Sequence, residues 1–131
     1  MGWIRPTAGD VAEEISRCLG EGDEDSARRL AFRFIEHFDK AGPDRRVEMV
    51  SERPGSTGDK RFDALLAGIV EFACASNDTV PPGWANDEDL FLDEFWFVSG
   101  MRSLHANALV HSPISLARRG VFVAQGSLTY A

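Results

Sequence analysis

The three histidines, His37, His105 and His111, are the first side chains to consider for acid-base catalysis or metal binding. A metal site on one helix uses two ligands three or four residues apart, because such residues lie on the same face. His105 and His111 are six residues apart and fall on either side of a predicted helix end. The spacing therefore predicts no metal site, and no motif for a bound cofactor accompanies it.

Two other sets of residues have the types, but not the pattern, of a catalytic site. Ser99, His105 and Asp93 are the residue types of a hydrolytic triad. Ser99 lacks the glycine-flanked turn between a strand and a helix that exposes such a nucleophile. Arg33 and His37 resemble the arginine and histidine of small helical toxin ribonucleases, but they are closer together than in that family. We expect them to form a solvated helix face, and we expect no catalytic residue in the chain.

The charge is unevenly distributed along the chain. The net charge is −7, and residues 62–101 contain no lysine or arginine. The same stretch carries eight carboxylates, Asp63, Glu71, Asp78, Asp87, Glu88, Asp89, Asp93 and Glu94. Such a surface repels nucleic acid and attracts cationic groups. The pattern predicts a basic protein as the partner and no direct contact with nucleic acid.

Residues 90–100, LFLDEFWFVSG, add aromatic rings to this acidic stretch. We interpret them as a turn and an amphipathic helix, in which Phe91 and Phe95 share a face while Trp96 and Phe97 point elsewhere. In one alternative, the C-terminal segment from Arg118 to Phe122 covers the second aromatic side. In the other, Trp96 or Phe97 stays partly exposed and holds a partner. The partner-binding residues predicted on the second alternative are Asp87, Glu88, Asp89, Asp93, Glu94, Trp96 and Phe97.

Helices must position these residues, because apolar side chains recur at helical spacing along most of the chain. The predicted helices begin at Asp10 as a cap, run through the apolar stripe from Ala27 to Phe38, and cover 44–52. The strongest pattern follows the candidate cap Asp59 and predicts a central helix with Leu65, Leu66 and Ile69 buried.

Shorter elements are predicted in the C-terminal half. Asn86 is expected to cap a short turn, and helices are expected over 101–110 and over 113–119, the latter capped by Ser112 and starting at Pro113. Residues 121–123 form at most a short extended segment. Together these elements predict an all-α fold with about six or seven short helices.

The length of 131 residues suits one compact domain over 1–131. Cys18 and Cys74 stand alone in apolar helical patterns, so we expect two buried, reduced thiols. No apolar run approaches the ~20 residues of a membrane-spanning helix, and the first residues do not form a basic region followed by an apolar stretch. We therefore expect a soluble cytoplasmic protein that does not contact a membrane.

Residues 57–130 carry an ordered set of motifs. They are TGDKRFDALL, a Pro-Gly-Trp at 82–84 with Leu-Asp-x-x-Trp-Phe downstream, and an ending of Pro-x-x-x-x-Arg-Arg-Gly-x-Phe-Val. In this order they resemble a domain of actinobacterial antitoxin-like proteins and related regulators, often encoded beside nucleotidyltransferase-type toxins. Family members commonly place a helix-turn-helix module ahead of the domain, and no such module is recognisable here. The resemblance therefore implies the protein-binding half of an antitoxin's role.

Three hypotheses about function remain open on the sequence. The first is a non-catalytic protein-binding module, antitoxin-like, that binds a basic partner through an acidic and aromatic surface. The second is a small enzyme or ligand-binding protein with a pocket where Trp84, Trp96 and His105 converge. The third is a structural or regulatory adaptor that has no toxin as its partner.

Overall fold

The N-terminal half forms three helices in a computed structural model that describes residues 5–98, 108 and 112–123. They are α1 (Ala8–Gly20), α2 (Glu24–Asp39) and α3 (Pro43–Val50). A reciprocal cap starts α1: Thr7 Oγ1 accepts from the Asp10 N–H, and the Asp10 carboxylate accepts from the Thr7 N–H, each at 3.0 Å. The prediction that Asp10 is the cap residue was wrong, because Asp10 occupies the third helical position of the cap that Thr7 begins.

The starts of α2 and α3 also follow local rules. Asp23 caps α2 by accepting from the Ser26 N–H, and α2 buries the predicted apolar stripe, including Phe34 and Phe38. Pro43 is the first residue of α3. An N–H group at this position has no partner within the helix, so the lack of an N–H in proline costs no hydrogen bond. The predicted bounds of 44–52 are therefore slightly displaced, since the helix is Pro43–Val50.

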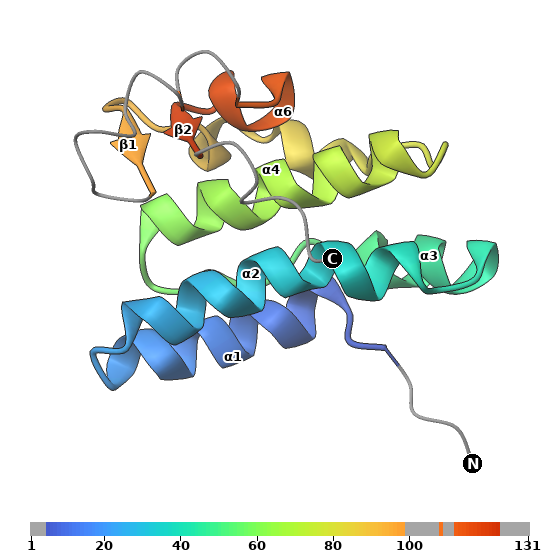
Figure 1. Cartoon of the computed structure of the whole chain (residues 1–131), viewed down its shortest axis with the longest axis horizontal. Helices are drawn as coiled ribbons and strands as arrows, with labels where there is room; N and C mark the ends of the chain where they lie inside the picture. Colours follow the sequence, from blue (N-terminus) through green and yellow to red (C-terminus); the bar gives the residue numbers. More distant parts are fainter. Residues whose placement is uncertain (1–4, 99–107, 109–111, 124–131) are drawn as a thin grey trace.

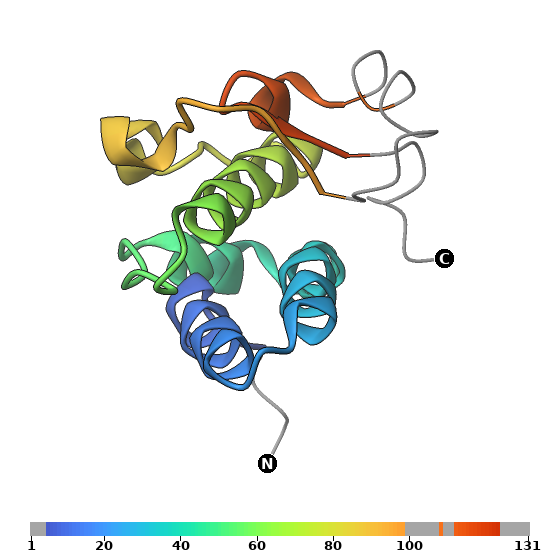
Figure 2. The same cartoon turned by 90° about the vertical axis from the view of Figure 1, so that its left-hand side faces the viewer.

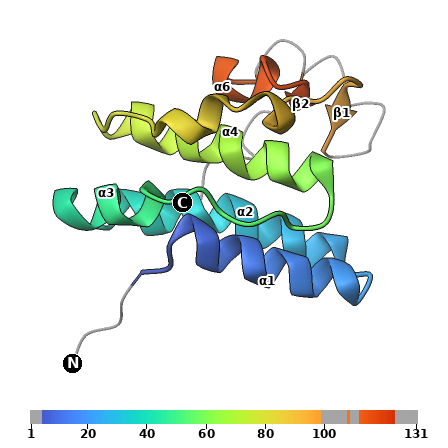
Figure 3. The same cartoon turned by 180° about the vertical axis from the view of Figure 1, so that it is seen from behind.

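The central helix, α4 (Lys60–Ser76), is confirmed with Asp59 as its cap. Leu65, Leu66 and Ile69 are 0%, 2% and 0% exposed, as predicted. α4 buries residues on more than one face because it lies between two layers (Figure 1). On one side it packs against α1 and α2, and on the other against the C-terminal elements, an arrangement also seen from behind in Figure 3.

The C-terminal layer consists of short elements around a parallel pair of strands (Figure 2). They are η1 (Gly83–Asn86), η2 (Glu88–Leu90), β1 (Trp96–Phe97), α6 (Ile114–Ala117) and β2 (Val121–Phe122), with the 3-10 helices marked η. Trp96 pairs with Val121 and Phe97 with Phe122. The short extended segment predicted at the C-terminal end is confirmed as β2.

The helix predicted within residues 90–100 was wrong for the residues described there. After η2 the chain bends at Phe91, Asp93 and Glu94 before β1, and the N–H groups of Leu92, Trp96 and Val98 donate to carbonyls of Arg119, Gly120 and Phe122. These donors bond to the C-terminal segment rather than within a helix. Long-range pairing has overridden the local helical spacing.

Two predicted caps in this layer were also wrong. Ser112 does not cap α6; its hydroxyl accepts from the Val123 N–H at 2.8 Å, and Pro113 takes the N-cap position. Asn86 ends η1, and Asp87 stands at the N-cap of η2 without a capping side-chain bond. The helix predicted over 113–119 is shorter, Ile114–Ala117, and Gly120 beyond it has a φ of 82° that a residue with a side chain rarely adopts.

The described residues form a largely all-α, single compact domain. The helix predicted over 101–110 lies outside the described residues except for Ala108. Among the helices described, none is both long and apolar enough to span a membrane. Cys18 and Cys74 are buried free thiols, as expected.

Candidate functional site

Arg53 neutralises part of the acidic surface predicted from sequence. Its Nη1 lies 2.6 Å from Asp87 Oδ2, and its Nη2 lies 2.5 Å from Asp89 Oδ2. The hydrogen bond from Arg53 lowers the pKa of Asp89 and, in return, the two carboxylates raise the pKa of Arg53. Asp87 and Asp89 are therefore engaged within the protein, which sequence reasoning missed because Arg53 lies 34 residues before Asp87.

Two neighbouring arginines, Arg118 and Arg119, cover Phe91. The guanidinium carbons of Arg118 and Arg119 lie 5.0 Å and 4.9 Å from the centre of the Phe91 ring. Cations at this distance are attracted to the face of the ring. Phe91 is thus held by the C-terminal segment and is half-buried.

Arg119 is fully buried and binds three elements together. Its Nη1 donates to Glu71 Oε1 of α4 at 2.7 Å and to the Ser115 carbonyl at 2.5 Å, and its Nη2 donates to the Ala85 carbonyl of η1. Arg118 donates to the same Glu71 oxygen at 2.7 Å. A buried charge of this kind persists only when paired and hydrogen-bonded.

Burial alone would raise the pKa of Glu71, but the hydrogen bonds from Arg118 and Arg119 outweigh it, and the pKa lies below its ordinary value. Sequence reasoning missed this network. The available signal was that Glu71 interrupts the apolar central helix, while Arg118 and Arg119 form an adjacent pair near the end of the chain.

The side chains of residues 95–97 alternate between two faces, so the ring of Trp96 lies on the opposite side from those of Phe95 and Phe97. Phe95 and Phe97 both contact Phe122, with ring centres 5.0 Å and 5.3 Å from it, because residues two apart in an extended chain share a face. Trp96 points to the other side, where its ring lies 5.2 Å from Phe62 and the Arg61 guanidinium lies 5.0 Å above it. Of the second aromatic side, Phe97 contacts Phe122 of the C-terminal segment, whereas Trp96 packs on Phe62, so the prediction that this segment covers that side holds for Phe97 alone.

Phe95 nevertheless remains 70% exposed. The two rings chosen from sequence, Trp96 and Phe97, are only half-buried, so neither is the most exposed ring of the segment. Asp93 and Glu94 precede Phe95 and are exposed. We call Asp93, Glu94 and Phe95 the Phe95 surface; Glu88 is a further exposed carboxylate, on η2.

The tryptophans expected to line a common pocket contact different parts of α4. Trp84 Nε1 donates to the Val50 carbonyl at 2.8 Å, and the ring lines a cavity of about 20 Å³ with Leu66 and Leu90. A space of that size holds about one water molecule. Trp96 packs on Phe62 instead, and His105, together with Ser99, lies outside the described residues.

The metal site and the Arg33–His37 pair that were considered from the sequence can be compared with the structure, together with the buried cysteine Cys74. Within the described residues, no group of three or more His, Cys, Asp and Glu side chains is placed to hold a metal ion. Arg33 is exposed as predicted, but His37 is half-buried, and burial followed by the charge of Arg5 lowers its pKa. Burial also raises the pKa of the Cys74 thiol to about 11, which keeps it protonated at neutral pH.

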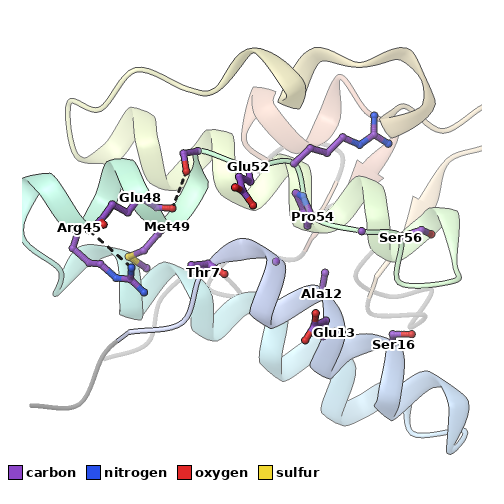
Figure 4. A pocket seen from close by; sticks show the side chains of 14 residues that line it. Thr7, Ala12, Glu13, Ser16, Arg45, Glu48, Met49, Glu52, Pro54 and Ser56 are labelled. Carbon is purple, nitrogen blue, oxygen red and sulfur yellow. Dashed lines mark hydrogen bonds and ion pairs between the residues drawn. The ribbon is translucent and has the colours of Figure 1, made fainter.

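A groove of about 700 Å³ lies in the other layer, between α1 and the chain that follows α3 (Figure 4). One wall is the exposed side of α1, and the other is α3 with residues 51–56. Sequence reasoning did not predict this groove, because its walls come from two segments that are distant in the chain, Thr7 to Ser16 and Arg45 to Ser56.

No family model, curated protein or solved structure matches this chain.

Proposed function

We propose that this protein is a non-catalytic, antitoxin-like binding module that holds a basic partner protein through the Phe95 surface. One observation carries the proposal: a phenylalanine that is 70% exposed stands beside two exposed carboxylates. An aromatic side chain rimmed by charge is a common centre of protein interfaces. The partner chemistry follows from complementarity to carboxylates.

The surrounding contacts support a preorganised surface. Phe95 leans on Phe122 at 5.0 Å, and the main chain on both sides of it donates to the C-terminal segment. A residue held in this way loses little conformational freedom on binding, which favours affinity. Asp87 and Asp89, already bound to Arg53, act as a support for the segment rather than as its main partner contacts.

The resemblance in residues 57–130 supplies the proposed class of partner, a nucleotidyltransferase-type toxin. The paired strands and the Arg118–Arg119 network lie within that stretch. The motif residues Trp96, Arg119 and Gly120 therefore hold the Phe95 surface in place, which is consistent with a role in binding.

The test is the affinity of purified protein for the product of the neighbouring gene, measured by calorimetry at two salt concentrations. Phe95→Ala should weaken binding by ~2 kcal/mol, about 30-fold, as expected for a central aromatic residue. Its thermal unfolding should change little, because the ring is mostly in water. Asp93→Asn with Glu94→Gln should weaken binding mainly at low salt.

Ile114→Ala is the matched control, since Ile114 is an equally exposed apolar side chain at 76%. It should leave the affinity unchanged. Equal binding by the Phe95→Ala and Ile114→Ala variants, or failure of the neighbouring gene product to bind at all, would reject the proposal. Catalytic turnover by the purified protein that disappears in His105→Ala would favour the enzyme alternative instead.

A further inference from the structure

The groove between α1 and α3 has one wall made of main chain that has no hydrogen-bond partner among the described residues. Residues 53–56 follow a bend at Ser51 and Glu52 and belong to no helix or strand, and none of the main-chain N–H or C=O groups of 52–56 forms a hydrogen bond within the part of the chain that the structure describes. Both ends of the segment are fixed. Arg53 binds Asp87 and Asp89, and Asp63 accepts from the Thr57 N–H and hydroxyl at 2.7 Å each. This wall is therefore a segment fixed at both ends, and its main-chain polar groups have no partner among the described residues.

The opposite wall and the floor leave room beside residues 52–56. α1 contributes Gly9, Ala12 and Ser16, whose side chains are small. The floor includes Ala12 and Met49, which are 2% and 1% exposed. Gly9 to Ser16 covers about 10 Å of helix, enough for roughly three residues of an extended chain alongside.

The charges around the groove select a cationic occupant. Glu13 and Glu52 face it from opposite walls (Figure 4), and neither forms a hydrogen bond or ion pair in the described part of the chain. The arginines of the lining are already engaged, since Arg45 donates to the Arg5 carbonyl at 2.5 Å and Arg53 binds two aspartates. A cation in the groove would therefore meet two carboxylates that are unpaired among the described residues.

From these three features we propose that the groove binds an extended, lysine- or arginine-bearing segment of a partner protein. The segment lies against residues 52–56 and forms main-chain hydrogen bonds with them, as in strand addition to an open edge. Its cationic side chains reach Glu13 and Glu52, and its apolar side chains lie over Ala12 and Met49. This groove is separate from the Phe95 surface, and its test does not depend on that surface.

The probe is a fluorescein-labelled hexapeptide of alternating lysine and valine, titrated into the full chain and followed by anisotropy and by backbone amide shifts in NMR spectra. Binding should shift the amides of Glu52, Arg53, Gly55 and Ser56. Combining Glu13→Gln with Glu52→Gln should weaken binding by about fivefold, since two exposed ion pairs are lost. A hexapeptide of alternating glutamate and valine should not bind.

Glu14→Gln is the matched control, because Glu14 neighbours Glu13 on α1, is exposed, and does not line the groove. It should leave peptide affinity unchanged. A peptide N-methylated on alternate residues keeps its charge but loses main-chain donors, and it should bind more weakly. No binding at millimolar peptide, equal loss in Glu14→Gln, amide shifts confined to the Phe95 surface, or undiminished binding of the N-methylated peptide would each overturn the proposal.

Discussion

At the residue scale, the Glu71 carboxylate pairs with the buried Arg119 and with Arg118. Replacing it with glutamine keeps the shape but leaves the buried Arg119 guanidinium without its counter-charge. We expect Glu71→Gln to lower the free energy of unfolding by about 3 kcal/mol at pH 7, as for other broken buried pairs. Urea unfolding measures this, with Glu14→Gln expected to stay within about 0.5 kcal/mol because Glu14 is exposed.

The same variant should change the pH dependence of stability. The folded protein holds the pKa of Glu71 below its ordinary value, so the carboxylate stabilises the fold fully above its unfolded pKa of about 4.3. That contribution is lost as the pH falls through the lower, folded pKa. The difference in stability between wild type and Glu71→Gln should therefore shrink below about pH 4. A difference that stays constant down to pH 2 would contradict the assigned pairing.

At the element scale, the contact between α4 and α6 depends on the absence of a side chain at Gly68. A Cβ there would lie 2.4 Å from Leu116 Cδ2 and 3.2 Å from the Ser115 carbonyl oxygen. Helix propensity alone would favour alanine by about 1 kcal/mol. Steric overlap should dominate, and we expect Gly68→Ala to destabilise the protein by about 1–3 kcal/mol.

Gly9→Ala on α1 provides the comparison, since its Cβ would meet only Thr7 Oγ1 at an ordinary 3.6 Å. It should be neutral or slightly stabilising, because alanine is the better helix former. Thermal unfolding of the two variants side by side measures both effects. Equal stability of the Gly68→Ala and Gly9→Ala variants would show that α6 does not pack on α4 as described.

At the scale of the whole molecule, α4 supplies core residues to both layers, so the layers should unfold together. Trp84 and Trp96 report on the C-terminal layer, whereas α1 and α2 contribute much of the helical circular dichroism. In a Trp3→Phe background, the urea transitions followed by tryptophan fluorescence and by circular dichroism should coincide. An earlier fluorescence transition would mean that the C-terminal layer opens independently of α1 and α2.

The sequence by itself determined the local part of this structure. The apolar spacing and Asp59 predicted α4 and its buried Leu65, Leu66 and Ile69, because a helix period and a cap are properties of neighbouring residues. The absence of basic residues from 62–101 predicted a cationic partner, and this stays a prediction.

Only the tertiary structure decided which of those acidic and aromatic side chains remain exposed. Pairing with β2 made residues near Trp96 extended instead of helical, and this change placed Phe95 outside and Trp96 on Phe62. Arg53 and Arg119 reach their carboxylates from 34 and 48 residues away along the chain. The physical reason is that strand pairing and ion pairing depend on contacts between distant segments, and their energies exceed the weak local preferences that a sequence pattern expresses.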